Sequence, residues 1–277
     1  MDTVQALLRS ARDLPGDSAL GDAEILLAHC LGKSRTWLYT WPDAAVSEAC
    51  AEQFRGLVQR RTMGEPVAYL TGHREFWSLD LAVTTSTLIP RPETETLVEW
   101  ALELSLPEQA DVVDLGTGTG AIALALATER PTWRVTAVDR SDAALAVARE
   151  NVQRCGLNNV NVARSDWFTA LAGQAFDLIV SNPPYVEEDD EHLAQGDVRF
   201  EPRVALVAGK AGLDDITRIV DRAPDFLRPG GWLLLEHGYR QGHEACALLQ
   251  QRGFEAVDTR RDLAGQDRIS GGRWRAD

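Results

Sequence analysis

The chain has 277 residues, of which 28 are Lys or Arg and 42 are Asp or Glu, so its formal net charge at pH 7 is -14. Hydrophobic residues make up 44% of the sequence, enough to build the core of one large domain or two unequal ones, which argues against a disordered chain. The longest uninterrupted apolar stretch, residues 121–127, is far shorter than the roughly 18 residues that a membrane helix needs. The first residues lack the pattern of a secretory signal, so we expect a cytoplasmic protein with no membrane association.

The negative charge is concentrated after residue 74. Residues 1–74 contain eight basic and nine acidic residues, whereas the rest of the chain carries a net charge of -13. A surface of that sign repels a phosphate backbone instead of releasing its counterions. We therefore expect no direct binding to nucleic acid.

The cysteines and histidines do not indicate a metal site or disulfides. The four cysteines lie far apart without a Cys-x-x-Cys pair, and no two of the five histidines have the spacing and flanking carboxylates of metal ligands. We expect free thiols and no metal.

Residues 1–74 have the apolar periodicity of a small helical bundle. The spacing predicts helices at 4–8, at 22–31 and from 47 to 64, where Ser47 is a favoured N-cap and Gly64 a favoured terminator.

Three aromatic residues, Trp37, Tyr39 and Trp41, fall in a predicted short connection within this bundle. We interpret them as core side chains, and an exposed docking surface is the alternative.

Residues 75–92 are predicted to form a hairpin-like β connector. In 76–83 every second residue from Trp77 to Val83 is apolar, which is the pattern of one strand with a single buried face. Two prolines then stiffen the start of an amphipathic helix at 97–104.

From residue 93 to 277, apolar strands alternate with helical patterns. Continuous apolar strands separated by helices indicate an α/β fold with a parallel sheet covered on both faces. The predicted strands are 111–115, 134–139, 159–164, 176–181 and 232–236, with a further pair at 256–262 and 268–274. The clearest helix begins after Ser141 and ends at Gly156.

A glycine-rich turn joins the first of these strands to a helix. It runs from Asp114 through Gly116, Thr117, Gly118 and Thr119 to Gly120. Glycines permit positive φ and let a ligand lie against the backbone, while the helix that follows offers free N–H groups. Asp139 ends the next strand, where a carboxylate can accept hydrogen bonds from a ribose diol.

The details of this turn favour S-adenosylmethionine (SAM) over NAD. The NAD fingerprint is Gly-x-Gly-x-x-Gly, whereas this turn is Gly-Thr-Gly-Thr-Gly and is preceded by Asp114. An acid there can meet a cationic amino group, which SAM has and the pyrophosphate of NAD lacks. The segment resembles the first motif of class I SAM-dependent methyltransferases, whose Rossmann-like fold we expect here.

The third strand ends at Ser165, Asp166 and Trp167, a position beside the adenine in such a fold. Asp166 or Ser165 can hydrogen-bond the ring edge, and Trp167 can cover its face. The alternative for Trp167 is a core aromatic.

The fourth strand ends at Asn182, Pro183, Pro184 and Tyr185. The two prolines fix an extended backbone, so that the Asn182 side-chain oxygen and the Pro183 carbonyl can both accept hydrogen bonds from one NH2 group. Tyr185 supplies a wall for a planar group and tolerates a nearby sulfonium cation. Because an amino group on an sp² carbon has a delocalised lone pair, two such acceptors help to turn that lone pair towards a methyl donor.

Together these motifs resemble the PrmC/HemK family of peptide chain release factor methyltransferases over essentially the whole chain. The motifs are Gly64 to Gly72, Arg74 to Trp77, Ile89 to Glu95, Asn182 to Tyr185 and Glu236 to Gly238. The resemblance implies methyl transfer from SAM to the side-chain amide nitrogen of the glutamine in the Gly-Gly-Gln motif of class 1 release factors. It further implies that the glycine turn holds the methionine part of SAM, that Asn182 touches cofactor and substrate, and that 182–185 grip the glutamine.

Two alternatives remain. An adenine-specific DNA amino-methyltransferase also uses an Asn-Pro-Pro-Tyr motif. Such an enzyme should carry a basic region that binds DNA, whereas this chain is acidic after residue 74. The second alternative is a SAM-binding protein without catalysis, which would not require Asn182. Replacing Asn182 by Ala would leave a pure binding role intact, whereas it should abolish the turnover of a methyltransferase. We expect a monomer.

Overall fold

The computed structural model describes residues 2–15 and 18–275, which form two compact units. The first unit comprises the chain up to His73 together with His192–Phe200, and the second comprises Arg74–Glu191 and the chain from Glu201 onward. In these described ranges no helix is long and apolar enough to cross a membrane. All four cysteines are free thiols.

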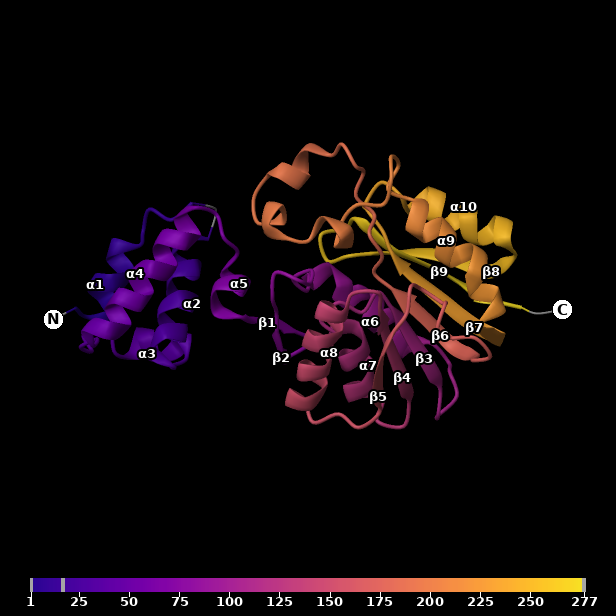
Figure 1. Cartoon of the computed structure of the whole chain (residues 1–277), viewed down its shortest axis with the longest axis horizontal. Helices are drawn as coiled ribbons and strands as arrows, with labels where there is room; N and C mark the ends of the chain where they lie inside the picture. The colour runs from indigo at the N-terminus through magenta and orange to yellow at the C-terminus, as the bar shows by residue number, and fades with distance from the viewer. Residues whose placement is uncertain (1, 16–17, 276–277) are drawn as a thin grey trace. The chain divides into compact units, whose positions relative to one another are not determined.

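The first unit is a helical bundle, as predicted (Figure 1). Its helices are α1 (Val4–Ser10), α2 (Ala19–Leu31), α3 (Arg35–Thr40), α4 (Glu48–Thr62) and α5 (Val67–Thr71). Leu26, Leu27 and Phe54 are fully buried in its core. The Ser47 hydroxyl accepts a hydrogen bond from the backbone N–H of Cys50 at 3.4 Å, so the predicted cap of α4 is confirmed.

Helix α3 occupies the segment that was predicted to be a connection. The Ser34 hydroxyl accepts a hydrogen bond from the Trp37 backbone N–H at 3.2 Å and starts this short helix. The helix buries Leu38, whereas Tyr39 and Trp41 are 63% and 57% exposed. The core interpretation is therefore wrong for these two aromatics, because a helical turn directs Leu38 inward in their place.

The segment 192–200 belongs to the first unit although it follows the Asn-Pro-Pro-Tyr motif in sequence. It contains the 3₁₀ turn η3 (Val198–Phe200) and all but the first residue of η2 (Glu191–Ala194). Arg61 donates to Asp22 and to Asp197, each at 2.8 Å, and Arg199 donates to the Met63 carbonyl at 2.7 Å. These contacts hold the segment within the bundle.

The second unit begins within a two-stranded hairpin, β1 (His73–Phe76) and β2 (Leu79–Ala82), whose first residue still belongs to the first unit. The prediction of one continuous strand over 76–83 is wrong. Trp77 and Ser78 both have positive φ, 53° and 60°, and form a two-residue turn of the kind that reverses a hairpin. The Glu95 carboxylate accepts from the Trp77 backbone N–H at 2.9 Å and holds this turn in place.

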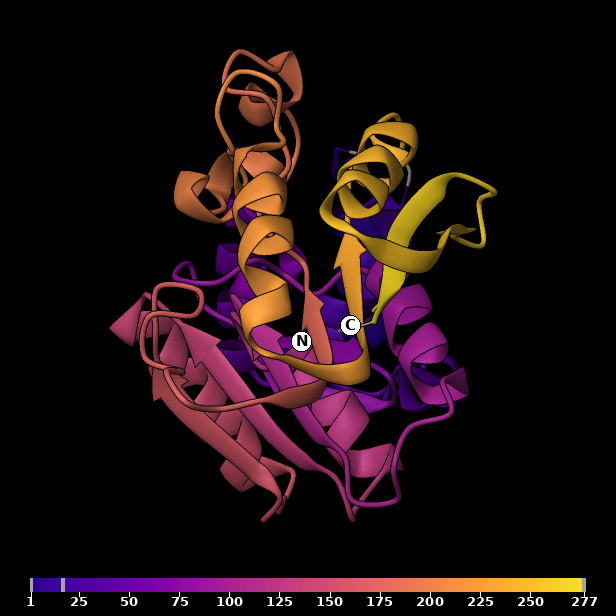
Figure 2. The ribbon, with the colours of Figure 1, turned by 90° about the vertical axis from the view of Figure 1, so that its right-hand side faces the viewer.

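A seven-stranded sheet forms the centre of the second unit (Figures 1 and 2). Its strands are β3 (Asp111–Leu115), β4 (Arg134–Asp139), β5 (Val160–Arg164), β6 (Phe176–Ser181), β7 (Leu227–Glu236), β8 (Phe254–Arg261) and β9 (Asp267–Trp274). They lie in the order β5-β4-β3-β6-β7-β9-β8. The first five are parallel, as predicted, while β9 runs antiparallel to β7 and to β8.

Strand β7 is longer than the predicted strand 232–236. It begins at Leu227 and includes the glycine pair Gly230 and Gly231. Leu227 pairs with Phe176, and Trp232 pairs with Leu178 after a register shift that contains Gly230, whose φ is +82°.

Helices cover both faces of the sheet. They are α6 (Glu95–Glu103), α7 (Ala121–Glu129), α8 (Asp142–Arg154), α9 (Asp214–Arg222) and α10 (Gly242–Arg252), with 3₁₀ turns η1 (Pro92–Thr94), η4 (Arg203–Ala205) and η5 (Ala223–Asp225). Alternate residues of β3 face opposite ways: Val112 packs in one core with α6 and α7, and Val113 packs in the other with α9 and α10. The predicted α/β fold is confirmed.

Candidate active site

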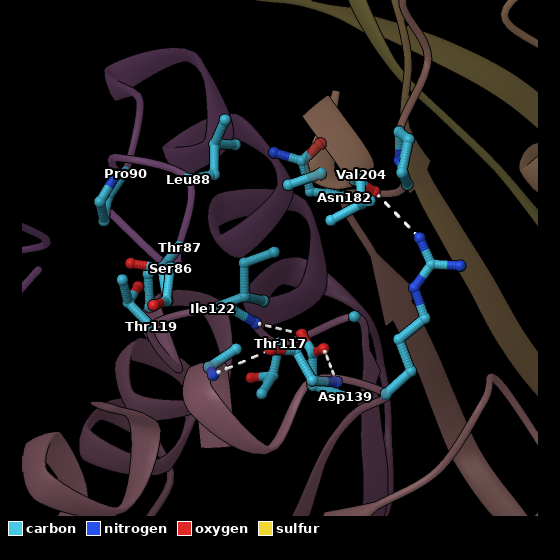
Figure 3. A pocket seen from close by; sticks show the side chains of 18 of the residues that line it. Ser86, Thr87, Leu88, Pro90, Thr117, Thr119, Ile122, Asp139, Asn182 and Val204 are labelled. Carbon is cyan, nitrogen blue, oxygen red and sulfur yellow. Dashed lines mark hydrogen bonds between the residues drawn. The ribbon is translucent and has the colours of Figure 1, made fainter. Parts of the chain in front are cut away.

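A pocket lies in the second unit at the carboxyl ends of β3, β4, β5 and β6, the edge where ligands bind in open α/β sheets. In Figure 3, Leu88 and Pro90 lie on one side of the pocket and Asn182 and Val204 on the other. The predicted site residues that line it are Gly116, Thr117, Gly118, Thr119, Asp139, Asp166, Trp167, Asn182 and Pro184. Those that lie outside its lining are Asp114, Gly120, Pro183 and Tyr185.

The turn after β3 needs glycine at three positions. Gly116, Gly118 and Gly120 have φ values of +72°, +56° and +86°, which L-residues with side chains rarely adopt. A Cβ on Gly118 would meet no atom within 4 Å, so its backbone faces open space in the pocket. The turn therefore leaves room for a ligand to lie directly on the main chain.

Asp139 is held rigidly at the end of β4. One carboxylate oxygen accepts from the Gly118 backbone N–H at 3.0 Å, and the other accepts from the Ser141 backbone N–H at 2.8 Å. Each oxygen retains a free lone pair, so the carboxylate can still accept hydrogen bonds from a ribose diol. This geometry fits the ribose role that the sequence predicts.

Asp114 is completely buried beneath the turn. It accepts a hydrogen bond from the Thr117 hydroxyl at 2.5 Å. Burial raises its pKa to about 7, and the nearby charge of Asp139 adds to this effect. Its position supports the turn, and its predicted interaction with a cationic amino group stays a prediction.

The residues after β5 form the far end of the pocket. The Ser165 hydroxyl donates to the Trp167 carbonyl at 2.6 Å, and Trp167 has a positive φ of 52°. The Trp167 ring lies against the turn, because a Cβ on Gly116 would come within 3.3 Å of it. The ring also packs against the second core, so Trp167 combines the two predicted alternatives of core aromatic and pocket wall.

The Asn-Pro-Pro-Tyr segment is tied to two residues, Thr94 and Glu236, to which the sequence analysis assigns no individual role. Asn182 donates from Nδ2 to the Thr94 hydroxyl at 3.3 Å, and Thr94 donates to Glu236 at 2.6 Å. Tyr185 donates from its hydroxyl to the other oxygen of Glu236 at 3.1 Å. Burial raises the pKa of Tyr185 well above its ordinary value and that of Glu236 to about 7.

A buried carboxylate joins the two sides of the pocket. Glu201 accepts from the Ile89 backbone N–H at 3.1 Å and forms an ion pair with Arg91. Residues 86–88 and 90–91 on one side of this contact and 204–205 on the other line the pocket. Arg140 also donates to the Val204 carbonyl at 3.2 Å. The segment between Pro90 and Glu95 therefore has a structural function that its sequence did not reveal.

Comparison with known proteins agrees with this arrangement. The family model "Methyltransferase small domain" matches residues 94–198, and the model "PrmC N-terminal domain" matches residues 3–72. A "Release factor glutamine methyltransferase" from Pseudomonas aeruginosa is 56% identical over 274 residues, which is 99% of this chain and 99% of that protein. The chain belongs to the release factor glutamine methyltransferase family. The Escherichia coli K12 member is 50% identical over 259 residues and covers 93% of each chain.

The second unit has the fold of class I methyltransferases. A methyltransferase from Pyrococcus furiosus superposes with a TM-score of 0.54 at 20% identity, covering 72% of this chain and 90% of that one. At that identity the likeness shows the fold alone.

Proposed function

We infer that this protein transfers a methyl group from SAM to the side-chain amide nitrogen of the glutamine in the Gly-Gly-Gln motif of class 1 peptide chain release factors. The observation that carries this inference is 56% identity to a release factor glutamine methyltransferase across 99% of both chains. The Asn-Pro-Pro-Tyr segment at the edge of the pocket supports it, because an amide NH2 is the group that this segment can bind. We further propose that the enzyme acts in the cytoplasm as a monomer.

The pocket fits SAM through groups that are already in place. The backbone at Gly118 faces open space for the methionine part, Asp139 would hold the ribose, and Asp166 with Trp167 would hold the adenine. When bound, SAM would supply the methyl group of its sulfonium: the S–CH3 bond breaks as the N–CH3 bond forms, and neutral S-adenosylhomocysteine is left. Asn182, at the end of β6, would contact both the cofactor and the substrate.

The acceptor amide would be gripped by the four residues after β6. The Asn182 side-chain oxygen and the Pro183 carbonyl accept its two N–H groups, while Pro184 and Tyr185 give the wall against which its plane lies. This orientation turns the nitrogen lone pair towards the methyl group and excludes water. The nitrogen becomes acidic only as the N–C bond forms, and its proton reaches solvent when the product leaves the pocket, so no strong protein base is required.

The test is methyl transfer from labelled SAM to a purified class 1 release factor. A factor whose Gly-Gly-Gln glutamine is replaced, and duplex DNA, serve as the other acceptors. We expect label on the intact factor alone, and the N182A enzyme should lose turnover by about a hundredfold or more while it still binds SAM. Label on DNA alone would overturn the proposed substrate.

The alternative of an adenine-specific DNA amino-methyltransferase has no specific observation in its favour. The net charge of -13 after residue 74 opposes binding to a polyanion.

We also propose that three consecutive parts of the chain have separate roles. Residues 1–74 would recognise the protein substrate, 75–92 would connect, and 93–277 would carry out the transfer. Exposed Tyr39 and Trp41 in the first unit support a docking role, because large aromatic side chains are enriched where proteins bind one another.

A further inference from the structure

Asn182 is the start of a hydrogen-bond chain that ends at one buried carboxylate. Asn182 bonds to Thr94, and Thr94 and Tyr185 bond to the two oxygens of Glu236. Thr94 is 4% exposed and Glu236 is 1% exposed, so water does not compete for these bonds. Thr94 comes from the end of η1 and Glu236 from the end of β7, which places both on elements outside the catalytic motif.

The chemistry of these groups fixes the direction of the chain. An ionised carboxylate only accepts hydrogen bonds, so the Thr94 hydroxyl must donate its single hydrogen to Glu236. The Thr94 oxygen can then only accept, and the Asn182 group that faces it must be the NH2. The Asn182 oxygen consequently points the other way. While Glu236 is ionised, this assignment follows from donor and acceptor counting and does not depend on telling the amide nitrogen from the oxygen.

We propose that Thr94 and Glu236 are positioning residues that hold the Asn182 amide with its oxygen towards the acceptor and thereby make the site select an NH2 group over a carboxylate. The proposal rests on the proposed function and deepens it. A glutamine side chain offers two N–H donors to the Asn182 oxygen and the Pro183 carbonyl. An isosteric glutamate offers only acceptors, which would be repelled by both.

The same carboxylate also places the wall of the acceptor site. Because Tyr185 donates to the second oxygen of Glu236, one side chain fixes both the hydrogen-bonding residue and the aromatic residue of the motif. The charged groups that act on Glu236 are Arg268, which favours its ionised form, and Glu93, which opposes it. A protonated Glu236 could donate to Thr94 and release the constraint on Asn182.

The test compares variants that remove or keep this chain. T94V removes the hydroxyl with little change of shape, T94S keeps it, and E236Q replaces the acceptor-only carboxylate by a group that donates as well. T128V is the matched control, because Thr128 donates to the Leu124 carbonyl within α7 and has no contact with Asn182.

Two quantities are measured for each enzyme. The first is the affinity for the intact release factor and for its Gly-Gly-Glu variant, measured by calorimetry in the presence of S-adenosylhomocysteine. The second is kcat with the intact factor. Wild type, T94S and T128V should prefer the glutamine factor by at least about tenfold. T94V and E236Q should bind the glutamate factor more tightly than wild type does, and their kcat should fall about tenfold or more.

The decisive result is that T94V and E236Q bind the glutamate factor more tightly than wild type does and bind the glutamine factor more weakly. A merely structural role for Thr94 would weaken binding of both factors together, and that result would overturn the proposal, as would an unchanged preference in T94V. The binding arm does not require turnover, so it judges the orientation of Asn182 even if wild type fails to methylate the factor. Failure of transfer by wild type would instead count against the proposed function.

Discussion

Asp139 accepts two backbone N–H groups, one on each carboxylate oxygen, and so joins the glycine turn to the start of α8. Asparagine at this position has only one acceptor oxygen and turns an NH2 towards a backbone donor. We expect D139N to weaken SAM binding by about tenfold to a hundredfold, because both the ribose contact and the turn are disturbed. Calorimetric titration with SAM measures this. An affinity within twofold of wild type would contradict the role of Asp139.

Asp114 gives the stability of the protein a specific dependence on pH. Its pKa is about 7 in the folded protein and 3.8 as the ordinary value, so the folded state binds this proton more tightly than the unfolded state. The stabilisation is present below about pH 4 and is lost as pH rises through about 7. In D114N this loss should be absent, so its unfolding free energy should vary less between pH 5 and 8. Urea titrations at several pH values measure the two slopes, and equal slopes would contradict the assignment.

The site residues that the sequence predicted carry a local signal. Gly116 and Asn182 lie directly after strands and Asp139 ends one, so strand prediction also places them. Thr94 and Glu236 are 142 positions apart, and Arg91 and Glu201 are 110 apart. Such contacts depend on how distant elements meet in space, and no local spacing encodes them.

At the scale of elements, Asn151 joins three pieces of the second unit. Its side chain donates to the carbonyls of Ala82 and Thr119 and accepts from the Ala82 backbone N–H at 2.7 Å, all without exposure to solvent. It thus ties the hairpin and the glycine turn to α8. N151A leaves these buried groups unpaired, and we expect the unfolding free energy to fall by about 2–4 kcal/mol. Chemical denaturation measures it, and a change below about 0.5 kcal/mol would contradict this account.

Glu201 holds the two segments that flank the pocket. E201Q retains one acceptor for the Ile89 N–H but loses the ion pair with Arg91. We expect SAM affinity to fall by about fivefold or more and the melting temperature to drop. R134A is the matched control, because Arg134 pairs with Asp111 at the opposite ends of the strands and is exposed. It should leave SAM affinity unchanged, and an equal loss in both variants would reject a specific role for Glu201.

The hairpin that the sequence analysis merges into one strand has an identifiable physical cause. The hairpin was read as one strand because its turn uses Trp77 and Ser78 at positive φ, a conformation that normally calls for Gly or Asn. The hydrogen bond from the Trp77 N–H to Glu95 compensates for this unusual turn, and Glu95 lies 18 residues away. The regular α/β elements were predictable because their apolar period is local and repeated.

At the scale of the whole molecule, the proposed separation of roles makes a prediction for the first unit. W41A removes an exposed aromatic side chain without touching the second unit. We expect KM for the release factor to rise about fivefold or more, with SAM affinity and melting temperature unchanged. L263A, which removes a fully exposed apolar side chain between β8 and β9, is the control and should leave KM unchanged. A KM for W41A equal to that of wild type would remove Trp41 from the docking surface.

The contact of Arg61 with Asp22 on one side and Asp197 on the other sets an order for folding. Asp22 is 39 residues away and is synthesised first, whereas Asp197 is 136 residues further along the chain. The bundle can therefore form early from its own helices, but its last piece arrives only after four strands of the sheet and the Asn-Pro-Pro-Tyr motif have been made. During synthesis, completion of the N-terminal unit is a late event, coupled by chain order to the part that carries the chemistry.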